Sequence, residues 1–115
     1  FMLDGQTSLL EDVFAVKPEL ESRIAQLTVQ RKLSLGPWYV LADQLLVGGE
    51  SLVRNLSLGL RQSQALGASL KVGYMPDTFG HSADLPTILQ GFGIDSAVVW
   101  RGVPGLSSPY FLWES

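Results

Sequence analysis

Apolar and polar positions in the second half of the chain predict a strand, a helix and a second strand, in that order. Residues 71–75 alternate between two faces, as a strand does, and Pro76 ends this strand because proline has no N–H to donate to a sheet. Apolar residues then recur at helical spacing over residues 85–92, after Ser82, which is a good helix N-cap. Residues 96–100 (SAVVW) form the second strand, so this stretch predicts a β-α-β unit.

The remaining residues predict three more helices and several short strands. Apolar stripes at helical spacing are bounded by residues that favour helix ends, and short β-like runs are separated by glycine and proline. We expect helices that begin at Thr7 or Ser8, at Pro18 and at about Ser51, the last with Leu52, Leu56 and Leu60 on its buried face and Gly67 at its end. We expect short strands over 1–3, 33–35, 38–41 and 110–113. A loop is expected to contain Gly102, Pro104, Gly105, Ser107 and Ser108.

This order of elements indicates an α/β fold. Strands that alternate with helices form parallel β-α-β units, in which the helices cover the sheet. Both ends of the chain fall in or next to strand-like segments rather than in linkers. We therefore expect residues 1–115 to be a fragment of a larger (β/α) barrel, truncated at both ends, and not a complete domain.

Composition narrows the partners without indicating a function. The chain has 115 residues, 46% of them hydrophobic, which suits a globular core. Its formal charge is −3 and its 8 lysine and arginine residues are scattered, so we expect no nucleic acid partner. It has no cysteine for a disulfide or a thiolate metal site, and no apolar run of the roughly 18 residues that a membrane span needs. We expect a cytoplasmic protein whose natural N-terminus lies upstream of Phe1, and composition leaves a homo-oligomer open.

Two oppositely charged residues follow the two strands of the β-α-β unit. Asp77 is the first residue beyond Pro76, and Arg101 stands at the end of the second strand. In parallel α/β folds the functional site lies at the carboxyl ends of the strands, so both side chains are presented to one site. A guanidinium near a carboxylate favours its ionised form and orients it. A purely structural interpretation competes, because an aspartate after a strand is often a turn residue and an arginine there often forms a surface ion pair.

The residues around Asp77 belong to an extended motif that covers essentially the whole chain. It comprises GYMPDTFGHS at 73–82, LP at 85–86, GFGI at 91–94 and VWRG at 99–102, with LDGQ at 3–6, WYV at 38–40, Asp43 and GESLVRNL at 49–56 upstream. This motif resembles the central signature of glycoside hydrolase family 38, the zinc-dependent retaining α-mannosidases. The resemblance implies a catalytic domain built as a seven-stranded α/β barrel, much longer than this chain, that hydrolyses terminal α-mannosidic bonds with retention of configuration.

The resemblance also implies roles for three residues. The family's aspartate that matches Asp77 is the nucleophile and also ligates zinc, which holds mannose hydroxyls and helps to distort the sugar ring. The aromatic residue that matches Phe79 contacts the sugar, and the arginine that matches Arg101 braces the nucleophile. Phe79 could otherwise be a core aromatic beside a turn, and Arg101 a structural salt-bridge residue.

Three further residues are weaker candidates. Asp43 follows a predicted strand as Asp77 does, and we expect it on the substrate side, although Gln44 stands where the family often has an acidic residue. His81 is the sole histidine. We expect it to support the site residues from behind or to have a structural role at the helix start, and not to bind metal, because the family's zinc histidines lie elsewhere. Glu50 is expected to be a helix-start charge that the helix dipole favours.

Several parts of the family's site are missing from the sequence. The chain has no H-x-D zinc pair, no second zinc histidine and no evident acid/base carboxylate. We therefore expect the full-length protein to be an α-mannosidase that acts on an oligosaccharide or conjugate, and the isolated chain to be inactive. The alternatives are a mannosylglycerate-type hydrolase, a metal-dependent hydrolase of another barrel type such as a carbohydrate deacetylase, and a noncatalytic carbohydrate-binding fragment.

Overall fold

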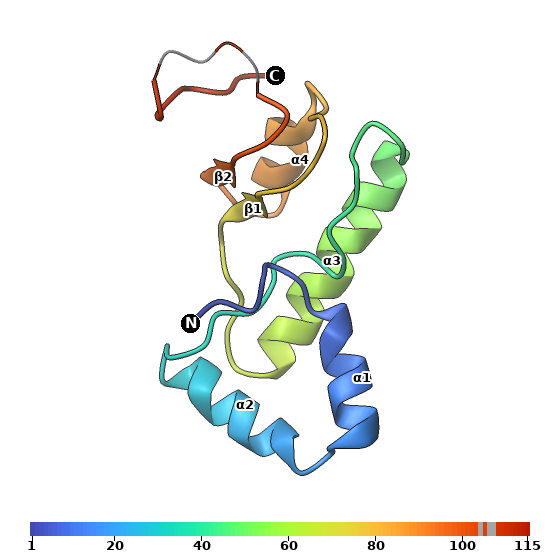
Figure 1. The fold of residues 1–115 in the computed structure, drawn as a ribbon, viewed down its shortest axis with the longest axis vertical. Coiled ribbons are helices and arrows are strands. Elements are labelled where there is room, and N and C mark those ends of the chain that lie inside the picture. The colour runs from blue at the N-terminus through green and yellow to red at the C-terminus, as the bar shows by residue number, and fades with distance from the viewer. Residues whose placement is uncertain (104, 106–107) are drawn as a thin grey trace. The chain divides into compact units, whose positions relative to one another are not determined.

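The computed structural model describes residues 1–103, 105 and 108–115 (Figure 1). The chain forms two compact units, residues 1–41 with 54–70 and residues 42–53 with 71–115. The first unit contains the helices α1 and α2 and most of α3, and the second contains a β-α-β unit. In chain order the elements are α1 (Ser8–Val16), α2 (Leu20–Val29), α3 (Gly49–Ala65), β1 (Gly73–Met75), α4 (Leu85–Gly91) and β2 (Ala97–Val99).

The first unit is built around one apolar cluster. Leu10 of α1, Leu35 and Leu66 are its buried members, and apolar side chains of α1, α2 and the segment before Leu35 pack on them. The apolar stripe predicted for α3 is confirmed, since Leu52, Leu56 and Leu60 are all buried. Gly67 follows α3 with φ +114°, a backbone conformation that glycine adopts without the penalty a Cβ would bring. The three helices predicted in this half are therefore confirmed to within a few residues.

The strands predicted over 1–3, 33–35 and 38–41 are reduced to two isolated parallel bridges. Met2 pairs with Ser34, and Gln6 pairs with Trp38. Between the bridges the first segment turns through a positive φ at Asp4 (+42°) and at the glycine that follows it. The second segment contains the Gly-Pro pair at 36–37, whose proline has no N–H for a ladder. Both segments are thus interrupted at the same level, so a continuous ladder cannot form.

The segment after residue 36 lies directly against α3. Asn55 of α3 accepts hydrogen bonds from Tyr39 N (2.8 Å) and Val40 N (3.0 Å) through Oδ1, and its Nδ2 donates to Val40 O at 2.7 Å. The phenol of Tyr39 donates to Glu11 Oε2 at 2.9 Å, and this bond, with lesser help from desolvation and nearby negative charge, raises the pKa of Tyr39. One asparagine side chain therefore binds the backbone of two consecutive residues beyond the bridge at Trp38.

The second unit confirms the predicted β-α-β arrangement. β1 and β2 are parallel, with Gly73 opposite Ala97 and Met75 opposite Val99. β1 is shorter than the predicted 71–75, because the partner strand begins only at Ala97 and leaves residues 71 and 72 without a ladder partner in the described structure. Leu89 of α4 is buried, in agreement with the predicted apolar stripe. The two strands show the parallel pairing, and the seven-stranded barrel remains a prediction.

Two details of the second unit differ from the prediction. Ser82 is not the N-cap of α4: the helix begins at Leu85 with Asp84 as its N-cap, because residues 82–84 form a turn in which Asp84 N donates to Ser82 Oγ at 3.3 Å. The strand predicted over 110–113 is not formed within the described residues, which supply no neighbouring strand for it. The predicted loop residues Pro104 and Ser107 lie outside the described residues.

No helix formed by the described residues has the length and apolar character that a bilayer crossing needs.

Candidate functional site

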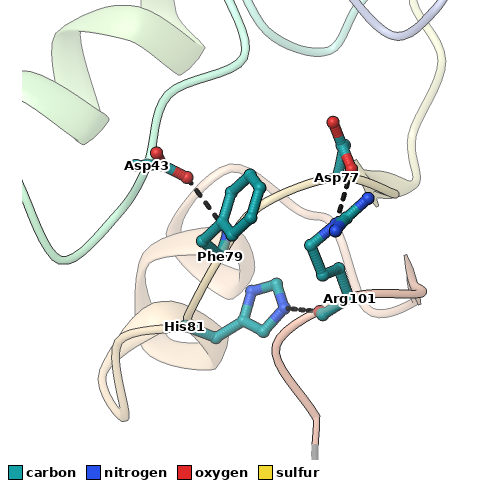
Figure 2. Close-up of polar contacts among 5 residues, drawn as sticks. All are labelled: Asp43, Asp77, Phe79, His81 and Arg101. Carbon is teal, nitrogen blue, oxygen red and sulfur yellow. Dashed lines mark hydrogen bonds and ion pairs between the residues drawn. The ribbon is translucent and has the colours of Figure 1, made fainter.

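The carboxyl ends of β1 and β2 bring Asp77 and Arg101 together, as the strand order predicts. Each residue lies two positions beyond its strand. Arg101 Nε donates to Asp77 Oδ1 at 2.7 Å, a short charge-assisted hydrogen bond. Figure 2 shows the other carboxylate oxygen of Asp77 pointing away from Arg101. The side chains of Asp77 and Arg101 are 69% and 54% exposed, so the pair faces solvent and is available to a ligand.

Phe79 lies beside this pair and completes an exposed group of three side chains. The guanidinium carbon of Arg101 is 4.6 Å from the centre of the Phe79 ring, a cation-π contact. Phe79 as a residue is 68% exposed, which argues against the alternative that it is a core aromatic. Its backbone N–H donates to Asp43 Oδ1 at 3.0 Å (Figure 2). Arg101 thus contacts both a carboxylate and an aromatic face, and Asp43 binds the backbone N–H of Phe79.

The backbone of Arg101 is held on both sides of its Cα atom. Arg101 N donates to Pro76 O at 3.2 Å, which extends the pairing of the two strands by one irregular step. Its carbonyl oxygen lies 2.9 Å from His81 Nε2 (Figure 2). At the next residue, Gly102, φ is +77° and a Cβ would lie 2.9 Å from both Gly80 N and Thr78 O. Only glycine allows the two strand-end loops to approach this closely.

Gln44 is a further residue of this site, and the sequence did not single it out. Its side chain is buried, with 4% of the residue exposed. Its amide nitrogen lies 3.0 Å from Met75 Sδ and 3.3 Å from His81 Nδ1, and its Oε1 accepts from Ser82 N at 3.1 Å. These partners are 31 to 38 residues away in the sequence, so no local pattern could have identified this residue.

The expected strand before Asp43 is absent from the described residues, although Asp43 does lie beside Phe79. Glu50 lies in the first turn of α3, where the helix dipole favours a negative charge, as predicted.

A solvent-open pocket of about 540 Å³ lies at the ion pair. Pro76, Asp77, Trp100 and Arg101 line it. A second pocket, of about 350 Å³, is lined by residues of α4 and β2, by the turn between them and by residues 109–113; Asp77 and Arg101 are not among its lining residues. A pocket with a carboxylate, a guanidinium and a neighbouring aromatic ring can accept a polar ligand that also has an apolar face, as a sugar ring does.

The described residues do not form a metal site by themselves. Among them no group of three or more histidine, cysteine, aspartate or glutamate side chains could hold an ion. Both ring nitrogens of His81 lie within hydrogen-bonding distance of other groups, Gln44 and the Arg101 carbonyl. A catalytic zinc typically has three protein ligands, more than the exposed carboxylate of Asp77 alone could supply.

The chain resembles known glycosidases over nearly all of its length. Residues 1–103 match the Glycosyl hydrolases family 38 N-terminal domain. The "Putative mannosylglycerate hydrolase" of Halalkalibacterium halodurans is 40% identical over 104 residues, which are 90% of this chain and 12% of that protein. Human alpha-mannosidase 2C1 is 33% identical over 116 residues, 96% of this chain and 11% of its own length.

A solved structure shows the same backbone. The crystal structure of an alpha-mannosidase from Enterococcus faecalis V583 superposes with a TM-score of 0.85 at 41% identity, covering 90% of this chain and 12% of that one. The chain therefore spans only about an eighth of the length of the relatives that it matches.

Proposed function

Because the chain belongs to glycosyl hydrolase family 38, we propose that the protein of which it forms part hydrolyses terminal α-mannosidic bonds with retention of configuration. The observation that carries this proposal is the exposed pair of Asp77 and Arg101 at the carboxyl ends of two parallel strands. Asp77 and Arg101 both belong to the motif described above, at 73–82 and 99–102, and the pair that they form faces an open pocket. Carbohydrate is the expected partner, and it would reach the pair from the solvent side.

Asp77 is the proposed nucleophile. Its carboxylate attacks the anomeric carbon while the bond to the leaving-group oxygen breaks, and water later hydrolyses the glycosyl ester. Arg101 donates to Oδ1 of this carboxylate, which leaves the outward-facing oxygen free to react. Retention requires a second carboxyl group about 5–5.5 Å from the first, to protonate the leaving group and then activate water. We place that acid/base residue outside residues 1–115.

Phe79 and Asp43 are proposed to act on the substrate side. The exposed ring of Phe79 offers an apolar surface on which a sugar face can stack. Asp43 acts through Phe79, since its Oδ1 holds the Phe79 backbone N–H. Its effect on the substrate would then be the placement of the aromatic ring.

Zinc is the proposed cofactor, with Asp77 as one ligand and the remaining ligands outside this chain. When bound, zinc would hold sugar hydroxyls and favour ring distortion. This assignment rests on membership of the family. The described residues form no complete metal site, so Asp77 would share the zinc with ligands that lie outside this chain. The isolated chain is therefore expected to bind zinc weakly.

A mannosyl conjugate is the second candidate substrate. The relative from Halalkalibacterium halodurans is named for mannosylglycerate and is 40% identical to this chain, whereas the human α-mannosidase is 33% identical. Both substrates contain the α-mannosyl bond that Asp77 would attack. A noncatalytic carbohydrate-binding role is the remaining alternative, and it requires no reactive carboxylate.

Replacing Asp77 in the full-length protein tests the proposal. Asp77→Asn keeps the size of the side chain but removes the nucleophile, so turnover of an activated aryl α-mannoside and of mannosylglycerate should fall to background, with reduced zinc content. Asp95→Asn is the matched control, because Asp95 is an exposed residue between α4 and β2 and should leave both properties unchanged. Near-normal turnover by Asp77→Asn with full zinc content would refute the proposal.

A further inference from the structure

The position of Arg101 is not set by the regular sheet. The last strand pair is Met75 with Val99, and Arg101 lies two residues further on with a half-exposed side chain. Exposed ion pairs are weak and screened by salt, so the bond to Asp77 alone does not hold a flexible arginine in one place. The fixed part of Arg101 is its backbone, which is bound at Pro76 O and at His81 Nε2.

Hydrogen-bond logic fixes the direction of each bond around His81. Ser82 N–H can only donate, so the atom of Gln44 that faces it must be the carbonyl Oε1. The amide NH₂ of Gln44 then faces His81 Nδ1, which must accept. The imidazole proton is therefore on Nε2, where it donates to the Arg101 carbonyl oxygen. Gln44 thus selects the tautomer of His81 that can hold Arg101.

The surroundings of His81 restrict the ring further. Trp113 contacts it edge to face, with the ring centres 5.5 Å apart and the planes at 77°. Gln44 is buried, so its amide is constrained by packing as well as by its bonds to Ser82 and Met75 Sδ. A constrained amide and a packed ring make a rigid support for a backbone carbonyl.

We infer that Gln44 and His81 are positioning residues that place Arg101 for its bond to Asp77. Gln44 orients the imidazole, and the imidazole holds the Arg101 carbonyl, which fixes where the guanidinium begins. Neither residue needs to touch the substrate. The inference rests on the proposed function for its kinetic consequence, but its structural consequence, the position of Arg101, does not depend on it.

Two substitutions of His81 separate its two bonds. The amide nitrogen of glutamine lies about as far from Cβ as imidazole Nε2, so His81→Gln can still donate to the Arg101 carbonyl. The amide of asparagine reaches only as far as Nδ1, so His81→Asn can meet Gln44 but not Arg101. In the full-length protein, His81→Asn should lower kcat by about tenfold or more with little change in KM, whereas His81→Gln should stay within about threefold of wild type.

Gln44→Met provides a third variant that keeps the length and burial of the side chain. It removes the amide from Ser82 and His81, so the imidazole loses its preferred tautomer and kcat should fall by an intermediate factor of about three to ten. Melting temperatures of all three variants show whether each one folds. If His81→Asn does not fold, Gln44→Met and His81→Gln still decide the question. A larger kcat loss in Gln44→Met than in His81→Gln supports the positioning role, and equal losses contradict it.

A structural measurement separates this inference from the proposed function. Crystal structures of the full-length wild type and variants give the distance from Arg101 Nε to Asp77 Oδ1, which is 2.7 Å here. We expect a hydrogen bond in the wild type and in His81→Gln, and a displaced guanidinium in His81→Asn. If the wild type hydrolyses no α-mannoside but His81→Asn displaces Arg101, the proposed function fails and the positioning role stands. An undisplaced guanidinium in His81→Asn, or equal kcat losses in the glutamine and asparagine variants, would overturn the positioning role.

Discussion

Replacement of Gly59 by alanine should destabilise the protein, although the same change in most helices is stabilising. Gly59 lies in the interior of α3, where alanine is ordinarily favoured over glycine by about 1 kcal/mol. A Cβ at this position would lie 2.2 Å from Trp38 C, 2.4 Å from Pro37 O and 2.4 Å from Tyr39 N. All three are backbone atoms, so no side chain can rotate away to make room.

The cost follows from how far the two segments must separate. Carbon atoms make ordinary contact at about 3.5–4.0 Å, so the backbone at Trp38 must move from α3 by more than an ångström. That movement also strains the bonds from Asn55 to Tyr39 and Val40. Overpacking costs about 1–3 kcal/mol and each weakened hydrogen bond about 0.5–1.5 kcal/mol. After the helix preference of alanine is subtracted, Gly59→Ala should lower the free energy of unfolding by about 2–4 kcal/mol.

Hydrogen exchange in the full-length protein measures this effect where it occurs. Amides of residues 38–41 should exchange faster in Gly59→Ala, and the urea midpoint of this region should fall. Gly91→Ala is the matched control: Gly91 ends α4, and a Cβ there meets nothing within 4 Å, so stability should be unchanged or slightly higher. A Gly59→Ala protein with wild-type exchange and midpoint would show that the close approach of α3 to Trp38 is not present in solution.

Three other substitutions test separate contacts. Arg101→Lys should lower kcat by about tenfold or more with KM little changed, because lysine lacks the planar fork of the guanidinium; a raised KM with unchanged kcat would instead make Arg101 a substrate-binding residue. Asn55→Asp should lower the free energy of unfolding by about 1–3 kcal/mol in urea titrations, since a carboxylate cannot donate to Val40 O, and equal stability would contradict this bond. Tyr39 should titrate above its ordinary pKa of 10.0, so that stability due to its bond with Glu11 is present below pH 10.0 and is lost as pH rises through the raised pKa. The difference in phenolate absorbance between wild type and Tyr39→Phe measures this pKa, and Glu11→Gln should lower it; an unchanged titration curve in Glu11→Gln would exclude the bond as the cause.

The β-α-β unit could be predicted because its signals are local. Alternation over a few residues, a proline that ends the strand, and apolar residues at helical spacing all act within one element. Local signals of this kind do not decide whether the strands predicted over 33–35 and 38–41 form. Whether they form depends on the turn at Asp4 in another segment, whose positive φ interrupts the only partner that the described residues offer them.

The site was predictable to the extent that topology determines it. Parallel strands bring their carboxyl ends to one edge, which is enough to place Asp77 near Arg101. The role of Gln44 was not predictable, because glutamine has no strong local preference that marks a structural function. In the sequence it stood out only as a departure from the family's usual acidic residue. Its burial and its three distant contacts come entirely from tertiary structure.

Two consecutive side chains explain how the exposed site keeps its shape. Asp43 accepts from Phe79 N, and Gln44 accepts from Ser82 N, so one short segment binds both ends of the loop 79–82. The loop backbone is thereby fixed while the side chains of Asp77 and Phe79 stay largely open to solvent. A site that must receive a polar ligand needs this combination, because fixed backbone lowers the entropy that binding would cost and exposed side chains leave the ligand a place to bind. Asp43 and Gln44 thus hold this loop by its backbone, and the side chains of Asp77 and Phe79 remain exposed.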